Sequence, residues 1–203
     1  DELLKTQIEA AKVILDTDCN LLLSSGTASG KTEAAFFPII TDILSHPECQ
    51  ASVSVLYIAP LKSLINDQFE RLTDLFDMTG ITVTHWHGDV GASHKNRLLK
   101  NPTGVLQITP ESLESMLMNR SNDIPRLFGK LRFIVINEIH SMMSADRGNQ
   151  ILCQLARIES IIERIPRRIG LSATVGDPEA VALWLSAGTK RLTDVPVFDN
   201  EKI

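Results

Sequence analysis

The segment Ser24–Glu33 constrains the fold most, because a strand-like run leads into it and a helix-like run follows it. Leu21–Leu23 is wholly apolar, and the residues after Glu33 favour a helix. A glycine-containing loop between a strand and a helix is the setting of a phosphate-binding loop. Gly30 has no side chain to hold a phosphate away, and a helix N-terminus offers N–H groups and partial positive charge. We therefore predict a nucleotide phosphate site at this loop.

Two side chains after the loop suit a bound nucleotide. Lys31 is expected to reach the β- and γ-phosphates, and the Thr32 hydroxyl is expected to hold Mg²⁺. The strict pattern G-x-x-x-x-G-K-[ST] is not fully met, because Ser25 occupies its first position and Ala28 stands where a glycine is common. The alternative is a helix N-terminus that begins Gly-Lys-Thr without any ligand. The rest of the chain decides between the two interpretations.

Composition places the chain among ordinary globular proteins and excludes several classes. Its 203 residues carry a net charge of −5, so no overall basic field attracts nucleic acid, and such contacts would come from local loops and backbone amides. Cys19, Cys49 and Cys153 are odd in number and far apart, which argues against a disulfide framework or a zinc site. Without a long apolar run or signal peptide, we expect a cytoplasmic protein with no membrane segment. The start at Asp1 is compatible with a fragment.

Apolar strand-like runs alternate with amphipathic segments along the whole chain. We expect strands near 21–25, 53–59, 81–85, 105–109, 131–136 and 168–172, and helices over 2–16, 31–45, 61–76, 93–100, 111–119, 148–165 and 178–186. This alternation predicts an α/β fold, with a mainly parallel sheet and helices on both faces, as a single domain over 1–203. Ligands of such sheets bind at the carboxyl ends of the strands.

A second polar segment, Asn137–His140, follows the most apolar of these runs. A nucleotide site needs a carboxylate opposite the phosphate loop to position the metal and polarise the attacking water. Glu138 is the candidate general base, and His140 could relay between the nucleotide and neighbouring loops. The plain alternative is an acidic helix cap or a solvated loop.

Together these segments resemble domain 1 of a superfamily 2 helicase of the DEAD/DEAH-box type, which has a RecA-like P-loop NTPase fold. Gly26–Glu33 resembles motif I, Ala59–Leu64 motif Ia, Thr109–Ser112 motif Ib, Asn137–His140 motif II and Ser172–Thr174 motif III. The resemblance covers about residues 7–187. The segments TEAAFFPII, LYIAPLKSLINDQ, HGD, TPESLE, IHSM…DRG and IGLSATVGDPE are most similar to the large helicase-related (Lhr-type) branch.

The resemblance implies an ATP-dependent helicase or translocase that uses ATP and Mg²⁺. Its partner would be single-stranded nucleic acid, DNA rather than RNA, with 3′-to-5′ unwinding. A second RecA-like domain, absent from this chain, would belong to the full-length protein and supply arginine fingers. The chain alone is therefore expected to bind nucleotide without unwinding.

The same resemblance assigns the site residues. The nucleotide would be held by Gln7, Gly26, Thr27, Ala28, Ser29, Gly30, Lys31, Thr32 and Glu33. The catalytic set would be Glu138, Asn137, His140 and Lys31, and Mg²⁺ would be held by Thr32 and Asn137. The nucleic-acid backbone would contact Pro60, Lys62, Ser63, Gly88, Asp89, Thr109, Pro110, Glu111 and Ser112. Ser172 and Thr174 would couple the two ligands.

Asn137 departs from the family, which has aspartate at this position. Asparagine is nearly isosteric but neutral, so we expect weak binding and slow turnover of Mg-ATP. It is either an inactivating substitution, which the otherwise regular motifs favour, or a natural feature of a chain with reduced activity. A nucleotide-gated nucleic-acid-binding module (a pseudo-ATPase) is therefore the main alternative function, and a P-loop kinase is a weaker one.

Other charged residues are given plain interpretations. Arg164, Arg167 and Arg168 are expected to cap and solvate a helix end. His85, His87 and His94 are expected to form a polar strand end rather than a metal site. The basic residues Lys95, Arg97 and Lys100 are expected on a solvated helix face, with nucleic-acid contact as the alternative.

Overall fold

The structure is a computed structural model that describes residues 4–26, 30–143, 145–173 and 175–196. Four residues of the predicted site, Thr27, Ala28, Ser29 and Thr174, lie outside these ranges. Within the described ranges, every helix is too short or too polar to cross a lipid bilayer.

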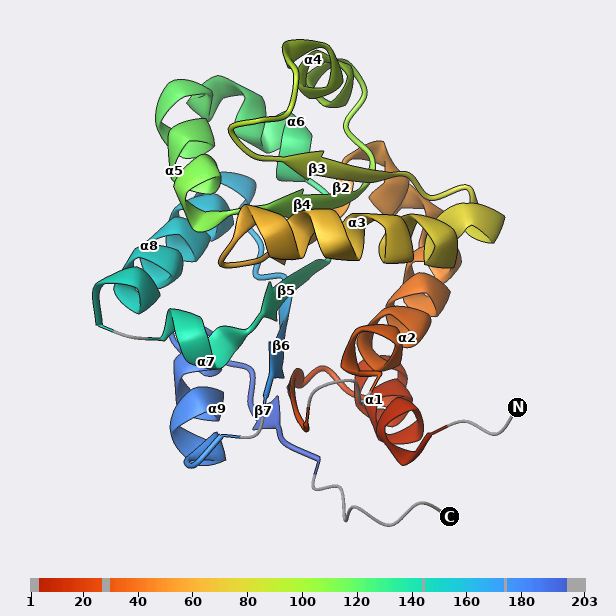
Figure 1. Ribbon diagram of the computed structural model, residues 1–203, viewed down its shortest axis with the longest axis vertical. Helices are drawn as coiled ribbons and strands as arrows, with labels where there is room; N and C mark the ends of the chain where they lie inside the picture. Colours follow the sequence, from red (N-terminus) through yellow and green to blue (C-terminus); the bar gives the residue numbers. More distant parts are fainter. Residues whose placement is uncertain (1–3, 27–29, 144, 174, 197–203) are drawn as a thin grey trace.

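A seven-stranded sheet forms the centre of the molecule (Figure 1). Its order is β3-β4-β2-β5-β6-β1-β7, and each neighbouring pair is parallel. The strands are β1 (Asn20–Ser24), β2 (Val53–Ile58), β3 (Val83–Trp86), β4 (Gly104–Ile108), β5 (Phe133–Asn137), β6 (Arg167–Ser172) and β7 (Thr193–Asp194). All residues of β2, β4, β5 and β6 are buried, as expected for parallel strands covered on both faces.

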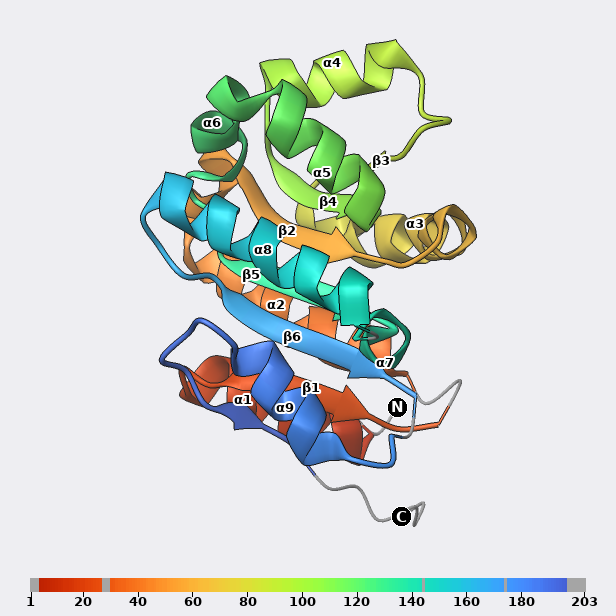
Figure 2. The ribbon, with the colours of Figure 1, turned by 90° about the vertical axis from the view of Figure 1, so that its left-hand side faces the viewer.

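Helices cover both faces of the sheet, which confirms the predicted fold class (Figure 2). One face is covered by α1 (Lys5–Asp16), α2 (Lys31–Ser45) and α3 (Lys62–Phe76). The other is covered by α4 (Ala92–Lys100), α5 (Pro110–Asn119), α6 (Ile124–Phe128), α7 (Ile139–Met142), α8 (Ala145–Ile162) and α9 (Pro178–Ser186). Short 3-10 segments span Pro47–Ala51, Asp77–Thr79 and Ser121–Asp123.

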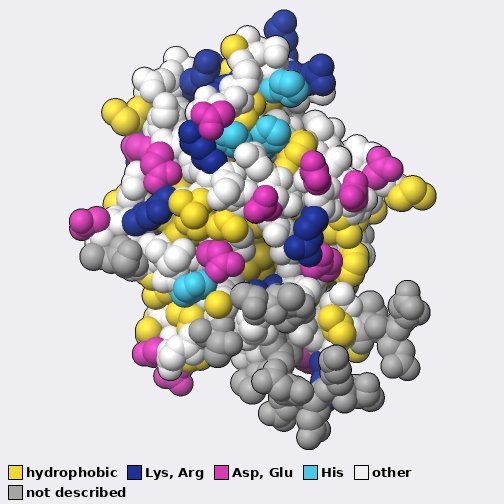
Figure 3. All heavy atoms as spheres, in the orientation of Figure 1, with side chains coloured by type: hydrophobic (Ala, Val, Ile, Leu, Met, Phe, Trp, Pro, Cys, Tyr) yellow, Lys and Arg dark blue, Asp and Glu magenta, His cyan; other side chains and the backbone are white. Residues whose placement is uncertain are grey.

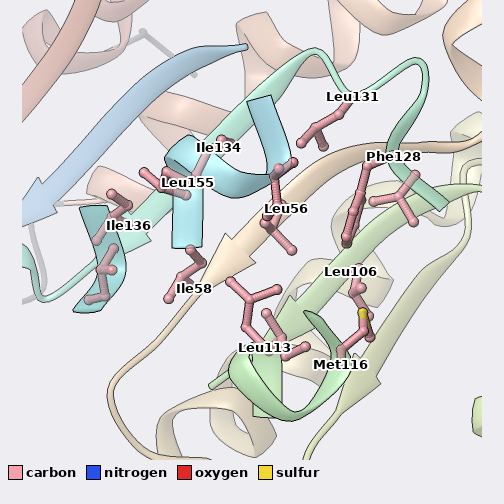
Figure 4. Packing of buried hydrophobic residues seen from close by; sticks show 14 of the residues in the cluster. Leu56, Ile58, Leu106, Leu113, Met116, Phe128, Leu131, Ile134, Ile136 and Leu155 are labelled. Carbon is pink, nitrogen blue, oxygen red and sulfur yellow. The ribbon is translucent and has the colours of Figure 1, made fainter. Parts of the chain in front are cut away.

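The strands β1, β2, β4 and β5 each contribute to two hydrophobic cores, because successive side chains point to opposite faces. In β1, Leu22 joins the core under α4–α9, and its neighbours Leu21 and Leu23 join the core under α1–α3. Figure 4 shows the first of these cores, where Leu56 of β2 packs near Leu155 of α8. Burial of such a side chain stabilises the fold by about 1.5–3 kcal/mol. The carboxyl ends of the strands are thereby held in fixed positions.

The elements agree with the sequence pattern except at a few points. The helix predicted over 148–165 spans Ala145–Ile162, and the strand predicted over 81–85 spans Val83–Trp86. The short elements α6, α7 and β7 were not predicted from the sequence. All three are shorter than a hydrophobic period needs to show itself.

The interpretation of the arginines before Ser172 was wrong for two of the three. Arg164 is exposed, but Arg167 and Arg168 are buried in β6. The Arg167 guanidinium donates to the carbonyl oxygens of Val13, Ile14 and Cys19, so it satisfies the C-terminal end of α1 instead. Arg168 pairs with Glu159 of α8 at 2.9 Å and donates to the carbonyls of Leu185 and Ala187. These partners, which are distant in sequence, offset the cost of burying the two charged side chains.

Candidate nucleotide and nucleic-acid site

The predicted phosphate loop connects β1 to α2. Gly30 is the residue before α2 and has φ +70°, a left-handed conformation that glycine adopts without strain. Its carbonyl accepts the first backbone bond of the helix from Ala34 at 2.8 Å. The Lys31 ammonium folds back onto the loop and donates to the carbonyls of Ser25 and Gly26 at 2.6 and 2.7 Å. A ligand with phosphate oxygens would find these donors gathered at the start of α2.

Glu138 lies within electrostatic reach of Lys31, so the two predicted catalytic segments face the same space. Burial lowers the pKa of the Lys31 ammonium, and the Glu138 carboxylate opposes that shift. Glu138 has φ +52°, which is unusual for a residue with a side chain and is stabilised here by the surrounding fold. It directly follows Asn137, the buried last residue of β5. The strand thus ends at Asn137, and the carboxylate that follows acts on the charge of Lys31.

A chain of polar side chains connects this carboxylate to the end of β6. Glu138 Oε2 lies 3.5 Å from His140 Nε2, and His140 Nδ1 lies 3.0 Å from Ser172 Oγ. The backbone beyond β6 in turn contacts the phosphate loop, because Ser25 N donates to Ser172 O and Ser24 Oγ donates to Ala173 O. The structure therefore brings together the segments that resemble motifs I, II and III.

Tyr57 is a site neighbour that the sequence interpretation missed. It is fully buried in β2, where burial raises the pKa of its hydroxyl above the usual range and the Glu138 charge raises it further. A single tyrosine within the otherwise aliphatic end of a central strand was the available signal. The phenol stays protonated and can present a neutral hydroxyl behind Asn137 and Glu138.

Two residues assigned to the nucleotide are engaged elsewhere. Gln7 Oε1 accepts a bond from Leu4 N at 2.9 Å, so its side chain caps α1. The start of α1 is nevertheless close to the loop, because a Cβ placed on Gly30 would lie 3.5 Å from Leu4 Cδ1. Glu33 forms an ion pair with Arg71 of α3. This ion pair therefore joins α2 to α3.

The donor set suits a nucleotide better than it suits a metal. The start of α2, the open backbone at Gly30 and the Lys31 ammonium all favour phosphate oxygens. Thr32 and Asn137 could offer oxygen ligands to Mg²⁺, but both are neutral, whereas this ion prefers one or two carboxylates. The neighbouring carboxylates are Glu138, which follows Asn137, and Glu33, which follows Thr32 and is paired with Arg71. These residues therefore suit the phosphates of ATP well. They suit Mg²⁺ less well, because Asn137 is neutral.

A second part of the site is an open groove of about 680 Å³ at the ends of β2 and β4. We define the groove by its lining residues, which are Pro60, Leu61, Lys62, Gly88, Thr109, Glu111, Ser112, Ser115 and Arg147. Six of the nine residues predicted to contact nucleic acid are among them, and Ser63, Asp89 and Pro110 adjoin them in sequence. Leu61, Ser115 and Arg147 were not predicted to contact nucleic acid.

Opposite charges are paired along the groove. Lys62 Nζ lies 3.1 Å from both carboxylate oxygens of Asp89, and its hydrogen bond lowers the Asp89 pKa. Arg147 pairs with Glu111 at 2.7 Å. Figure 3 likewise shows basic and acidic side chains mixed over this face of the molecule. Local contacts rather than an overall field would have to hold a nucleic acid here.

The starts of α3 and α5 both open on the groove. Lys62 is the first residue of α3, and Pro110, which needs no N–H partner, is the first residue of α5. Thr109 caps α5 by accepting a bond from Ser112 N at 3.3 Å. Unpaired backbone N–H groups at two helix starts are donors for phosphate oxygens.

His85 lies in β3, and His87 follows the strand directly and precedes Gly88 of the groove; both are packing residues. His87 is buried and its Nε2 lies 3.1 Å from Asn66 Oδ1, while its ring stacks on that of His85. Burial lowers the pKa of both rings. In the described ranges there is no cluster of three or more His, Cys, Asp or Glu side chains that could hold a metal ion.

Known proteins share both the sequence and the fold of this chain. The family model for the DEAD/DEAH box helicases matches residues 4–181. A "Lhr helicase/ probable uracil glycosylase" of Mycolicibacterium smegmatis is 35% identical over 181 residues, which cover 82% of this chain and 12% of that protein. The "ATP-dependent helicase Lhr-Core" of Methanothermobacter thermautotrophicus is 35% identical over 192 residues, 85% of this chain and 22% of that protein. The chain thus spans less than a quarter of either relative.

A solved structure gives the same result in three dimensions. The structure of Mycobacterium smegmatis helicase Lhr bound to ssDNA and AMP-PNP has a TM-score of 0.79 and 32% identity, covering 95% of this chain and 25% of that one. The expected RecA-like fold and the resemblance to the Lhr-type branch are confirmed. The relatives and the solved structure named above are all helicases of the Lhr type. The chain belongs to the DEAD/DEAH box helicase family.

Proposed function

We propose that this chain is the ATP-binding domain of an ATP-dependent helicase or translocase that moves on single-stranded nucleic acid. The observation that carries the proposal is the polar chain Glu138–His140–Ser172, which starts beside Lys31 and ends against the phosphate loop. The groove lies at the same edge of the sheet. One edge therefore presents a nucleotide site and a strand-binding site together.

The residues of the nucleotide site have separate tasks. The start of α2 and Lys31 would bind the phosphates, with the ammonium exchanging its loop carbonyls for phosphate oxygens. Glu138 would hold the attacking water and accept its proton, since it is the carboxylate that faces Lys31. His140 would hold Glu138 in place and transmit its position to Ser172. Bound Mg²⁺ would supply charge neutralisation at the phosphates, held by Thr32 and, weakly, by Asn137.

The groove would hold the sugar-phosphate backbone of one strand. Its backbone N–H groups, Lys62 and the hydroxyls of Thr109 and Ser112 can bind phosphate without reading sequence. We propose DNA over RNA and 3′-to-5′ movement, because the similar solved structure is described with ssDNA and the sequence resembles the Lhr-type branch. We also propose a second RecA-like domain that completes the motor, and a cytoplasmic location compatible with three free cysteines.

The test uses a protein that carries this chain together with its second domain and Asp at position 137. We expect ATP hydrolysis that oligo(dT) stimulates, and loss of that hydrolysis in Lys31→Ala. Equal activity without any single strand would refute a translocase. Nucleotide binding without hydrolysis even with Asp at 137 would favour the alternative that Asn137 suggests, a nucleotide-gated binding module.

A further inference from the structure

We infer that Arg147 is a positioning residue that sets the spacing between the two backbone segments of the groove, an inference that rests on the proposed function. Arg147 lies in the first turn of α8, on neither of the two segments. Its Nη2 donates to Pro60 O at 2.8 Å and to Glu111 Oε1 at 2.7 Å. One guanidinium thus joins the turn after β2 to the helix start after β4.

The two joined segments are those that would meet the strand. Pro60 directly precedes the start of α3, and Glu111 lies in the first turn of α5. A strand held through backbone N–H groups at both helix starts needs those groups at a fixed separation. A misplacement of about 1 Å is enough to weaken such a site greatly. A planar guanidinium with several donors fixes two acceptors better than a flexible ammonium does.

The other described contacts of α8 with the groove-forming helices are confined to α5. Gln154 is buried and donates to Pro110 O and to Glu114 at 3.0 Å each, and Arg157 pairs with Glu114 at 2.6 Å. These contacts hold α8 to α5 but do not reach Pro60. Arg147 adds the link across to the other segment.

The start of α8 also lies close to the nucleotide side of the site. A Cβ on Gly148 of α8 would lie 2.9 Å from the carbonyl oxygen of Met143, the residue after α7, so α8 packs closely against the end of α7. The short helix α7 begins directly after Glu138. Arg147 is therefore nine residues after the proposed general base and holds the proposed strand-binding segments.

A direct phosphate contact by Arg147 would have different consequences from a positioning role. Its charge is already offset by Glu111, and its side chain is only 31% exposed. For single strands, the logarithm of affinity falls with the logarithm of salt by about 0.7 per phosphate contact. Loss of a direct contact lowers that slope, and loss of a positioning contact leaves it unchanged.

The experiment measures binding of fluorescein-labelled oligo(dT) to this chain by anisotropy over a series of salt concentrations. Arg147→Ala is expected to weaken binding about tenfold, as loss of charge-assisted bonds predicts, with the salt slope and Mg-ATP affinity unchanged. Arg147→Lys should recover part of the loss. Glu111→Gln should weaken the binding of oligo(dT), because it weakens the contact between Arg147 and α5. Arg157→Ala, which removes an ion pair of the same helix outside the groove, is the matched control and should bind as the unaltered chain does.

Four results would overturn the inference and leave the proposed function standing. Three of them are unchanged binding by Arg147→Ala, a salt slope lowered by about 0.7, and an equal loss in Arg157→Ala. Tighter binding by Glu111→Gln would also overturn it, because Glu111 would then be a competitor of phosphate. If the unaltered chain binds Mg-ATP but no oligo(dT), the nucleic-acid part of the proposed function fails and the inference fails with it.

Discussion

Asn137→Asp is expected to destabilise the free chain and to tighten its binding of Mg-ATP. Asn137 is only 8% exposed at the end of β5, with Glu138 beside it. A buried polar group without a partner costs about 1–3 kcal/mol, a charged one costs more, and the neighbouring carboxylate adds repulsion. The unfolding free energy without ligand should fall by at least that amount.

Asn137→Asp is expected to make the binding of Mg-ATP more favourable. Two unit charges about 4 Å apart attract by about 4 kcal/mol at an effective dielectric constant near 20. Desolvation and repulsion from Glu138 offset part of this attraction. We expect a net gain of about 1.4–3 kcal/mol, which tightens Mg-ATP binding roughly 10- to 100-fold. ATP in the presence of EDTA should gain nothing or lose affinity, because the added charge repels the phosphates.

Calorimetric titration with Mg-ATP and with ATP plus EDTA measures this difference, and thermal unfolding measures the stability. Asn20→Asp is the matched control, because Asn20 is also buried but lies at the start of β1, at the other end of that strand from the phosphate loop. It should destabilise the chain without changing Mg-ATP affinity. If Asn137→Asp leaves the two titrations equally strong, position 137 has no part in metal binding and the site assignment is wrong.

Three further predictions concern the groove and the fold. Asp89→Asn releases Lys62, so the salt slope of oligo(dT) binding should become steeper by about 0.7, and an unchanged slope would mean that Lys62 meets no phosphate. The pKa of His87 is lower in the folded chain than in the unfolded one, so the unfolded state binds more protons and stability should fall as the pH drops below about 6.5. Thermal unfolding of His87→Gln should show a smaller loss of stability at low pH than the unaltered chain does. Arg168→Met leaves Glu159 charged and buried, which should cost about 3–5 kcal/mol by urea unfolding, and the further change Glu159→Leu should restore much of it.

Local sequence patterns predicted the elements well, because each depends on neighbouring residues. The apolar run before Ser24, the glycine before Lys31 and the helix after it are all adjacent in the chain, so strand, loop and helix could be inferred together. The same holds for Asn137 and Glu138 at the end of β5. The sheet order was not accessible in this way, since β3 pairs with β4 while β2 pairs with β5.

The failures concern side chains whose partners are distant in sequence. Arg167 looks like a solvated charge next to a helix end, and only the fold shows the carbonyls of α1 around it. His140 and Ser172 were both predicted as site residues, but their direct contact was not, because they are 32 residues apart and meet only through the neighbouring strands β5 and β6. Arg147 was missed for the same reason, since Pro60 and Glu111 are 87 and 36 residues away. Such side-chain contacts depend on the order of the strands in the sheet, which the hydrophobic periodicity of the sequence does not reveal.

The central claim is that the loop at Gly30 and Lys31 binds the phosphates of ATP. Calorimetric titration of Mg-ATP into this chain, with and without Asn137→Asp, tests it directly. We predict binding that Lys31→Ala abolishes and that Lys12→Ala, an exposed lysine of α1, leaves unchanged. No heat of binding in either background, or equal affinity in Lys31→Ala, would contradict the account.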